Sequence, residues 1–323
     1  MEQAAASDGT GGPYTSVMPG DANTQAALLP TTSRGTNRGA FALTEWGLLS
    51  AVALIWGSSF VFMAIGLDAF NPGVITLARV GLGALTLVLV PRARAAIDRR
   101  DRTRTFVLGI IWIGIPLLIF PIAQQWIDSS VAGMLNGAVP ITSAMFATLL
   151  LKRLPGWRQL LGISIGFVGI VAISAPELAE SSATALGTLL VVGAVVLYGL
   201  STNLAVPLQQ KYGALPVLFN AQLAALVIVV PFGLAQIPGS AWAWPSALAM
   251  LPLGVLGTGV AFVLMATLVG RVGGPRGSVA IYFVPIVAIV LGVIVRDDAI
   301  EPIAIAGAAF VLLGAWITSR RET

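Results

Sequence analysis

The sequence contains no cysteine and no histidine among its 323 residues, and only 10% of them are charged. Without cysteine there is no thiol nucleophile and no disulfide, and without histidine there is no Ser-His-Asp triad. Zinc sites of the usual kind and haem ligated by histidine are excluded in the same way. We therefore predict that the protein is not an enzyme, with no catalytic residue, no metal site and no cofactor.

Apolar residues take the place of the missing charges, because 57% of the chain is hydrophobic. Soluble globular proteins carry charge on about a quarter of their residues. Such a composition indicates that the chain is embedded in a lipid bilayer. The segment 1–41 is the exception, since it is rich in Ala, Gly, Thr, Ser, Pro and Asn and cannot bury enough apolar surface to offset the entropy of folding. We expect it to be a disordered cytoplasmic tail.

Beyond the tail the chain is a series of apolar stretches of about 17 to 25 residues. This length crosses a hydrocarbon core of roughly 30 Å at a helical rise of about 1.5 Å per residue. Helices are expected because lipid offers no hydrogen-bond partner to backbone amides. The sequence predicts an all-α polytopic membrane protein with ten transmembrane helices, over residues 46–66, 72–91, 105–126, 129–151, 157–174, 187–206, 216–236, 246–269, 276–295 and 302–318.

Positive charge gathers in alternate loops. Sixteen of the 18 Lys and Arg residues fall in the tail and in the loops on its side, whereas the opposite loops contain only Arg296. Because cytoplasmic loops retain positive charge, we predict a protein of the cell (inner) membrane with both termini in the cytoplasm. The basic residues form short loops at the bilayer surface rather than one continuous stripe, which argues against a nucleic-acid partner.

An internal repeat appears when the sequence is shifted along itself by 145 residues. Five glycine or proline pairs then coincide: Gly109 with Gly254, Gly114 with Gly259, Pro140 with Pro285, Gly162 with Gly307, and Gly169 with Gly314. With small adjustments Trp56-Gly57-Ser58-Ser59 also aligns with Tyr198-Gly199-Leu200-Ser201. We therefore divide the chain into two five-helix halves, 42–175 and 186–318. Because five is odd, the second half is inverted relative to the first, as in secondary transporters that bind solutes near the midplane.

Parts of both halves resemble a known family. Three parts of the first half resemble the EamA repeat: Leu54-Ile55-Trp56-Gly57-Ser58-Ser59-Phe60, Pro72 followed by Arg79, and the stretch from Pro140 to Gly169. Residues 276–316 resemble a second copy of the repeat. The resemblance covers essentially all of 46–318. It implies the drug/metabolite transporter superfamily, with ten helices, two EamA domains and export or exchange of small metabolites. One departure is Lys152, where the family often has an acidic residue.

Substrate contacts are expected from polar or amphipathic side chains near the middle of the spans. Seven residues meet this description: Trp56, Arg79, Asn136, Tyr198, Ser201, Thr258 and Tyr282. All of them except Ser201 are predicted to contact the substrate. Trp56 and Tyr198 occupy matching positions in the two halves, so we expect them on opposite walls of one cavity, where aromatic faces would stack flat solutes or hold a cation. Packing against lipid or a neighbouring helix is the alternative. Trp112 and the Gln124-Gln125 pair are expected toward the outer end of the third span.

Arg79 is the only charged residue within the predicted membrane core. It lies seven residues past Pro72, which is about 10 Å into the membrane at helical rise. A charge at the bilayer centre costs at least about 2.5 kcal/mol on insertion scales and usually marks a pathway or a paired residue. One interpretation is that Arg79 binds a carboxylate or other anionic group of the substrate. The alternatives are that it reaches the outer surface or binds backbone carbonyls near Pro116 and Pro121.

Small and helix-breaking residues have structural rather than chemical interpretations. Gly162, Gly166 and Gly169 are spaced for the close approach of a neighbouring helix. The prolines within spans are expected to shape and bend the helices around a cavity.

The function that these features favour is a secondary transporter of small metabolites, amino-acid-like or otherwise small and amphipathic. We expect it to export or exchange them across the cytoplasmic membrane by alternating access, with a small-molecule substrate and the lipid bilayer as its partners. No nucleotide-binding motif of the G-x-x-x-x-G-K-[ST] type is present, and no intramembrane carboxylate could relay protons. Facilitated diffusion or exchange is therefore favoured. A membrane channel or a membrane-embedded enzyme is the alternative, although neither a charged ring nor a reactive cluster is visible.

Overall fold

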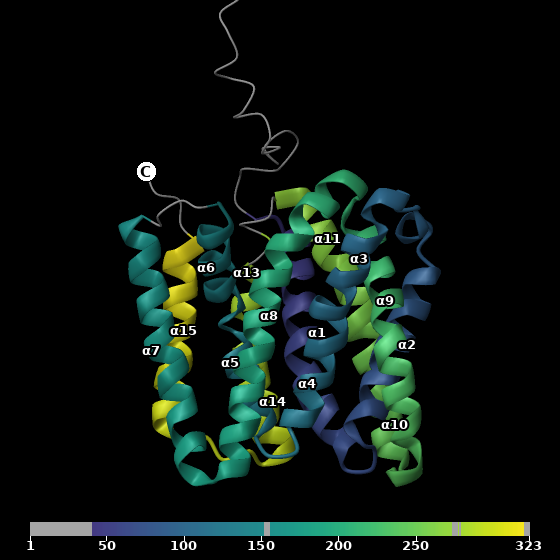
Figure 1. The fold of residues 1–323 in the computed structure, drawn as a ribbon. Coiled ribbons are helices and arrows are strands. Elements are labelled where there is room, and N and C mark those ends of the chain that lie inside the picture. The colour runs from purple at the N-terminus through teal and green to yellow at the C-terminus, as the bar shows by residue number, and fades with distance from the viewer. Residues whose placement is uncertain (1–40, 152–155, 273–276, 278, 320–323) are drawn as a thin grey trace, which may run out of the picture.

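The computed structural model describes residues 41–151, 156–272, 277 and 279–319, and these form a bundle of helices that run side by side (Figure 1). The expected tail, 1–41, lies outside the described residues apart from Phe41. The elements of the first half are α1 (Leu43–Leu67), α2 (Pro72–Val88), η2 (Pro91–Arg94), η3 (Arg99–Asp101), α3 (Arg102–Gly109), η4 (Ile110–Gly114), α4 (Ile115–Ala123), α5 (Ser129–Asn136), α6 (Val139–Leu151) and α7 (Trp157–Glu180). Those of the second half are α8 (Ser182–Tyr212), α9 (Ala214–Ala235), η5 (Ile237–Gly239), α10 (Trp244–Leu251), η6 (Pro252–Val260), α11 (Ala261–Val272), α13 (Val279–Tyr282), α14 (Val284–Arg296) and α15 (Pro302–Ser319).

Eight helical stretches of the described chain are long and apolar enough to cross a bilayer. Two shorter apolar helices, Pro72–Val88 and Pro302–Ile317, occupy the positions of the second and tenth predicted spans. Large apolar side chains are exposed along the outside of the bundle, for example Leu54, Leu149 and Ile294. Such exposure is expected where the solvent is hydrocarbon. The molecule is thus a multi-pass, all-helical membrane protein.

Interruptions of the helices recur at matching positions in the two halves. The third stretch of each half contains a π-helical segment, η4 in the first and η6 in the second, and the 145-residue shift places η4 on residues 255–259, inside η6. The fourth stretch of each half breaks just before Pro140 or Pro285. Because proline lacks a backbone N–H and its ring crowds the preceding turn, both kinds of interruption have a local cause.

The fifth and sixth helices are longer than the sequence predicts. Helix α7 continues through Pro176 to Glu180, and α8 begins directly after Ser181. Ser181 caps α8, since its side-chain oxygen accepts a hydrogen bond of 3.1 Å from the Thr184 amide. From the sequence, Pro176 and the acidic residues that follow it favour a loop. A proline within a membrane helix is nevertheless tolerated where neighbouring groups form hydrogen bonds with the backbone carbonyls that it leaves unpaired.

The two ends of the bundle differ in charge. One end, called here the basic end, has the segment between α2 and α3, Lys211 and Arg271, and α15 ends on the same side (Figure 1). Helix α1 leaves this end, whereas α8 runs toward it and finishes beside Asp101, to which Lys211 donates a 2.8 Å hydrogen bond. At the opposite end Arg296 is the single basic residue of the described chain, and it binds Asp68 at 2.8 Å. The first helices of the two halves therefore run in opposite directions.

Contacts between the halves repeat in pairs. Helix α1 packs against α14, and its counterpart α8 packs against α6; α2 packs against η6, and α9 packs against α3 and η4. Close approach at glycine explains the first pair. A Cβ atom at Gly57 would lie 2.6 Å from Val287 Cγ1, and one at Gly199 would lie 2.6 Å from the Thr142 carbonyl carbon. Val287 and Thr142 are themselves 145 residues apart. Each half thus completes the other by an equivalent set of contacts.

Glycines also join the last helices of the halves, α7 and α15. A Cβ atom at Gly169 would lie 2.6 Å from the Gly307 carbonyl oxygen, and one at Gly307 would lie 2.7 Å from the Gly169 carbonyl oxygen. Gly166 and Gly162 approach Gly314 in the same way. The predicted packing face of Gly162, Gly166 and Gly169 is therefore confirmed, and its partner is α15.

A valine at Gly169 is expected to destabilise the fold. The nearest atoms belong to the backbone of α15, so the helices must separate, at a cost of about 1–3 kcal/mol in unfolding free energy. Gly193→Val in α8 is the matched control, because nothing lies within 4 Å of a Cβ atom at that position. Unfolding of the purified variants in detergent measures both. Equal losses in the two variants would mean that only helix propensity has changed.

Candidate functional site

A cavity of about 440 Å³ lies between the two halves. Its walls come from both, and their residues are mainly apolar or aromatic: Trp56, Ser59, Phe60, Arg79, Trp112, Ile113, Leu117, Phe120, Asn136, Val139, Tyr198, Thr202, Gln209, Ala214, Leu215, Leu218, Thr258, Phe262, Met265, Ala266, Val269, Ile281 and Val284. Five of the six residues predicted to contact substrate are among them. The exception is Tyr282.

Arg79 is the charged residue of this lining. Its side chain extends from α2, is only 8% exposed, and donates from Nε to Thr258 Oγ1 at 3.0 Å and from Nη1 to Met63 Sδ at 3.3 Å. No acidic side chain of the described chain pairs with it. The guanidinium therefore neither reaches the end of the bundle nor binds the carbonyls near Pro116 and Pro121. It is buried beside the cavity with donors left for a ligand, since a guanidinium has five N–H groups.

Thr258 connects Arg79 to the opposite half. It lies in the π-helical segment η6, where its hydroxyl accepts the bond from Arg79 and makes a 3.3 Å bond to the Leu253 carbonyl. Its own carbonyl accepts a 2.7 Å bond from Nε2 of Gln222, which is fully buried in α9. The same π-helix supplies the Gly257 carbonyl, which accepts a 3.0 Å bond from Trp56 Nε1. Its irregular backbone thus anchors two lining residues, Arg79 and Trp56.

Aromatic rings form most of the remaining surface near Arg79. Trp56 and Trp112 both meet Phe262 edge-on, with ring centroids 5.3 and 6.3 Å apart. Phe120 stacks on Tyr198 at 6.0 Å and meets Phe60 edge-on at 5.6 Å. Trp112 lies midway along the third span, between Arg102 and Ala123, and not toward its outer end as expected from the sequence. Rings at these spacings form a rigid apolar wall.

Asn136 and Tyr282 lie near the breaks of the fourth and ninth spans and behave differently. Asn136 ends α5 and lines the cavity. The hydroxyl of Tyr282 donates a 3.0 Å hydrogen bond to the Ala315 carbonyl of α15. Its ring packs against the main hydrophobic core, and Ile281 and Val284 line the cavity in its place. The position of Tyr282 near midspan could not indicate this, because the break before α14 sets the direction of the side chain.

The cavity extends toward the basic end. Its lining includes Thr202, which is exposed, and Gln209, which is half-buried in the last turn of α8. Gln209 lies about 16 Å beyond Tyr198 at helical rise. Met63 and Met134 are fully buried and are not part of the lining. Thr202 and Gln209 were missed in the sequence because only the middle of each span was considered. The polarity of α8 near its end is the signal that could have found them.

The described chain holds no group of three or more Asp or Glu side chains that could bind a metal ion. The arrangement suits a different task, which is to surround a small solute with aromatic rings and to offer it one cation.

Comparison with known proteins agrees with this geometry. The family model described as "EamA-like transporter family" matches residues 45–175 and 185–320. The chain belongs to this family. Membership places it in the drug/metabolite transporter superfamily, as a membrane transporter of small solutes.

Several curated relatives of this EamA-like transporter span almost its whole length. An uncharacterized transporter of Archaeoglobus fulgidus is 23% identical over 87% of this chain and 100% of its own. A probable terminal-alkyne amino-acid exporter of Streptantibioticus cattleyicolor is 24% identical over 85% of this chain and 93% of its own. An S-adenosylmethionine/S-adenosylhomocysteine transporter of Chlamydia muridarum is 29% identical, but over 36% of this chain and 37% of its own.

A solved crystal structure shares the fold of this EamA-like transporter. It superposes with a TM-score of 0.58 at 17% identity, covering 85% of this chain and 96% of that one.

Replacing Thr258 by valine tests the bond to Arg79. The isosteric change leaves a buried cation without its acceptor, which is expected to cost about 1.5–3 kcal/mol in unfolding free energy in detergent. In a protein that already carries Arg79→Met, Thr258→Val should lower the unfolding free energy much less, because the hydrogen bond between the two side chains is already absent. Thr267→Val on the exposed face of α11 is the control. An equal cost in both backgrounds would show that Thr258 acts only through its bond to Leu253.

Proposed function

We propose that this protein is a ten-span secondary transporter in which two inverted five-helix repeats, 42–175 and 186–318, alternate the access of a central cavity between the two sides of the cytoplasmic membrane. Its cargo is a small amphipathic solute with an anionic group, of the amino-acid class, which it exports or exchanges. The observation that carries the proposal is Arg79, the one buried cation among the residues that the structure describes, in a largely aromatic cavity between the halves.

The chemistry of the cavity selects the cargo. A carboxylate can accept two parallel hydrogen bonds from a guanidinium, which gives orientation as well as affinity. The rings around it suit an apolar body, and a volume of about 440 Å³ lies within the range of small-molecule sites. The amino-acid exporter among the relatives supports the same class of cargo. One arginine suits one anionic group, whereas multiply charged phosphate esters would need several cations.

The paired contacts support alternating access. The cavity extends toward the basic end, and interactions between the halves close the opposite end, among them Asp68 with Arg296 and Asn71 with Ser240. Because equivalent helices pack in equivalent ways, exchanging the conformations of the two repeats would open the opposite end and close the basic one. No carboxylate of the described chain lines the cavity, and an exchange or facilitated mode requires none. The abundance of positive charge at the basic end supports its placement in the cytoplasm.

Substitution of Arg79 tests the recognition of the anionic group. Arg79→Lys should insert normally but transport about ten- to a hundredfold less well, because a point charge replaces two parallel charge-assisted bonds. Arg79→Ala should abolish counterflow of an apolar amino acid in liposomes while sparing its primary amide, which needs no counter-charge.

Three controls complete this experiment. Trp56→Ala and Tyr198→Ala should reduce acid and amide alike, because they remove walls of the cavity. Arg158→Ala, a half-buried arginine over the Trp157 ring and outside the cavity lining, should change neither. All variants are compared at matched membrane abundance. An equal loss of acid and amide in Arg79→Ala would assign Arg79 a structural role and overturn recognition.

Reporter fusions test the orientation. Fusions after Asp98 and after Thr323 should be cytoplasmic, and fusions after Glu180 or Gly239 should be external, because the charge difference between the two ends sets the topology. Activity of a cytoplasmic reporter after Gly239, or of an external one after Thr323, would contradict the ten-span arrangement.

A further inference from the structure

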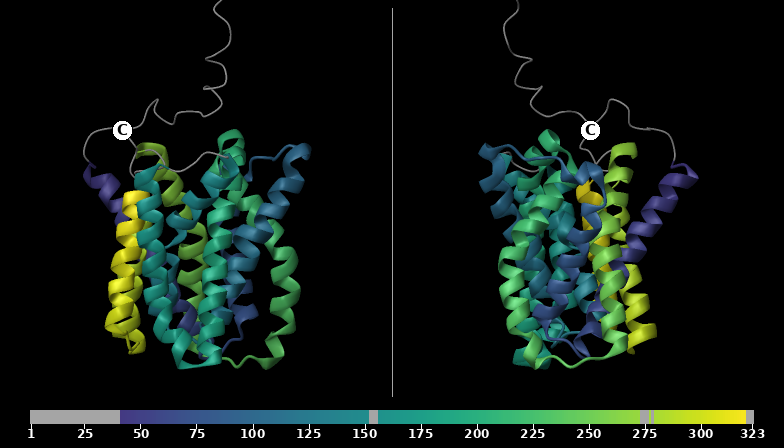
Figure 2. Two further views of the ribbon diagram at one scale, coloured as in Figure 1. Left: turned by 60° about the vertical axis from the view of Figure 1, so that its left-hand side comes forward. Right: turned by 90° about the vertical axis from the view of Figure 1, so that its right-hand side faces the viewer.

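The segment between α2 and α3, together with the first turn of α3, presents six arginines in one short stretch. It forms the two 3-10 turns η2 and η3 at the basic end, on the perimeter of the bundle and beside α9 (Figures 1 and 2). All six side chains are exposed: Arg92, Arg94, Arg99, Arg100, Arg102 and Arg104. The membrane topology needs positive charge on this side, but it does not require an ordered arrangement.

Two buried residues fix the backbone of this segment. Ala93 is fully buried in a cluster with Leu87 and Leu218. Ile97 is 4% exposed and packs with Leu208 and Val217 of the second half. The arginines on either side of these two anchors are therefore displayed from a fixed backbone.

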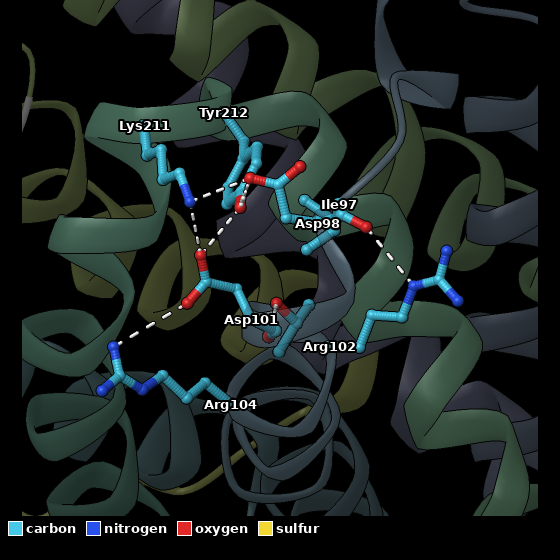
Figure 3. Close-up of polar contacts among 8 residues, drawn as sticks. Ile97, Asp98, Asp101, Arg102, Arg104, Lys211 and Tyr212 are labelled. Atoms are coloured by element: carbon cyan, nitrogen blue, oxygen red, sulfur yellow. Dashed lines mark hydrogen bonds and ion pairs between the residues drawn. The ribbon is translucent and has the colours of Figure 1, made fainter.

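The two acidic residues of the segment are engaged by the end of α8 (Figure 3). Lys211 Nζ lies 3.0 Å from Asp98 and 2.8 Å from Asp101, and the Tyr212 hydroxyl lies 2.9 and 2.7 Å from the same carboxylates. The bond from Lys211 holds the pKa of Asp98 below its usual range. The negative charges of Asp98 and Asp101 are thus compensated by Lys211 at the end of α8, and not only by the arginines of the segment.

Four of the arginines have no such engagement. Arg102 donates to the Ile97 carbonyl at 3.3 Å, and Arg104 lies 3.8 Å from Asp101 (Figure 3). Within the described chain the others make no hydrogen bond or ion pair, and we call them the arginine platform: Arg92, Arg94, Arg99 and Arg100. Four guanidinium groups are therefore available to an external anion.

The apolar surface next to the platform gives its depth relative to the bilayer. Leu85 and Leu89 on α2 are 63% and 81% exposed, and Phe106 and Val107 on α3 are 44% and 49% exposed. These side chains border the platform in sequence and have no protein to cover them, so they face hydrocarbon. Arg92 follows Leu89 by three residues. The platform therefore lies where hydrocarbon gives way to headgroups.

We propose that the arginine platform is a binding site for the phosphate groups of anionic phospholipids in the leaflet that the basic end faces. Guanidinium groups bind phosphate oxygens in pairs, and clusters of four or more basic residues next to a membrane helix attract anionic lipid. The site is separate from the cavity, and it does not depend on the cargo. Bound lipid would hold α2, α3 and the end of α8 together, because the segment contacts all three.

Thermal unfolding of the full-length protein in neutral detergent tests this site. Phosphatidylglycerol, phosphatidylcholine and inorganic phosphate are the probes. Phosphatidylglycerol should raise the melting temperature well above the value in phosphatidylcholine, and phosphate alone should have no effect. In R92Q/R94Q/R99Q/R100Q the rise in melting temperature caused by phosphatidylglycerol, called here the increment, should fall by at least half. In the unsubstituted protein the increment should decline in high salt, because salt screens exposed charges.

Two further variants make the result decisive. R99Q/R100Q should lose an intermediate part of the increment and replaces the fourfold variant if the latter does not fold. R320Q/R321Q is the control, because it removes two charges near the C-terminus, as many as R99Q/R100Q removes, and it should keep the full increment. The proposal is overturned if the platform variants keep the increment or if the control loses as much as R99Q/R100Q. It is also overturned if phosphatidylcholine or inorganic phosphate stabilises the protein as well as phosphatidylglycerol does.

Discussion

Close approach of helix backbones at glycine is the constraint on which the rest of this structure depends. In lipid there is no hydrophobic force to drive helices together, so packing has to come from contacts that only small residues allow. Gly169 and Gly307 bring α7 and α15 within reach of each other's carbonyl groups. Gly57 and Gly199 do the same for the first helix of each half. Because these positions repeat along the chain, the contacts repeat in space, and a pseudo-symmetric bundle results.

The cavity is a consequence of this arrangement. Each half packs its second and third helices against the other half, and the π-helical segments η4 and η6 lie at these contacts. A π-helix alters the hydrogen bonding of one or two turns, which allows the Gly257 and Thr258 carbonyls to accept bonds from Trp56 and Gln222. The same segment directs the Thr258 hydroxyl at Arg79. The irregular backbone thus provides hydrogen-bond partners for Trp56, Gln222 and Arg79, and the rest of the lining is mainly aliphatic and aromatic.

Two sets of arginines in this molecule have opposite surroundings. Arg79 is isolated in the interior, where the low dielectric strengthens any bond to an anion. The arginines between α2 and α3 are exposed on a fixed backbone, and the acidic residues among them are bound by Lys211 and Tyr212. A single buried cation suits selection of one solute, whereas an exposed group at the membrane surface suits a permanent component of the bilayer.

Sequence alone determined the helical class, the two-repeat family and the glycine face of α7, because these depend on composition and on the period and spacing of residues along one helix. It also singled out Arg79, since a charge in an apolar stretch is visible without coordinates. The tertiary structure decided which candidates share a cavity. Tyr282 was assigned to the pathway from its depth, but the break before Pro285 directs it to Ala315, and Phe262 and Gln209 were not expected. Depth in a span can be read from sequence, whereas the direction of a side chain depends on helix rotation, which packing between the two halves sets.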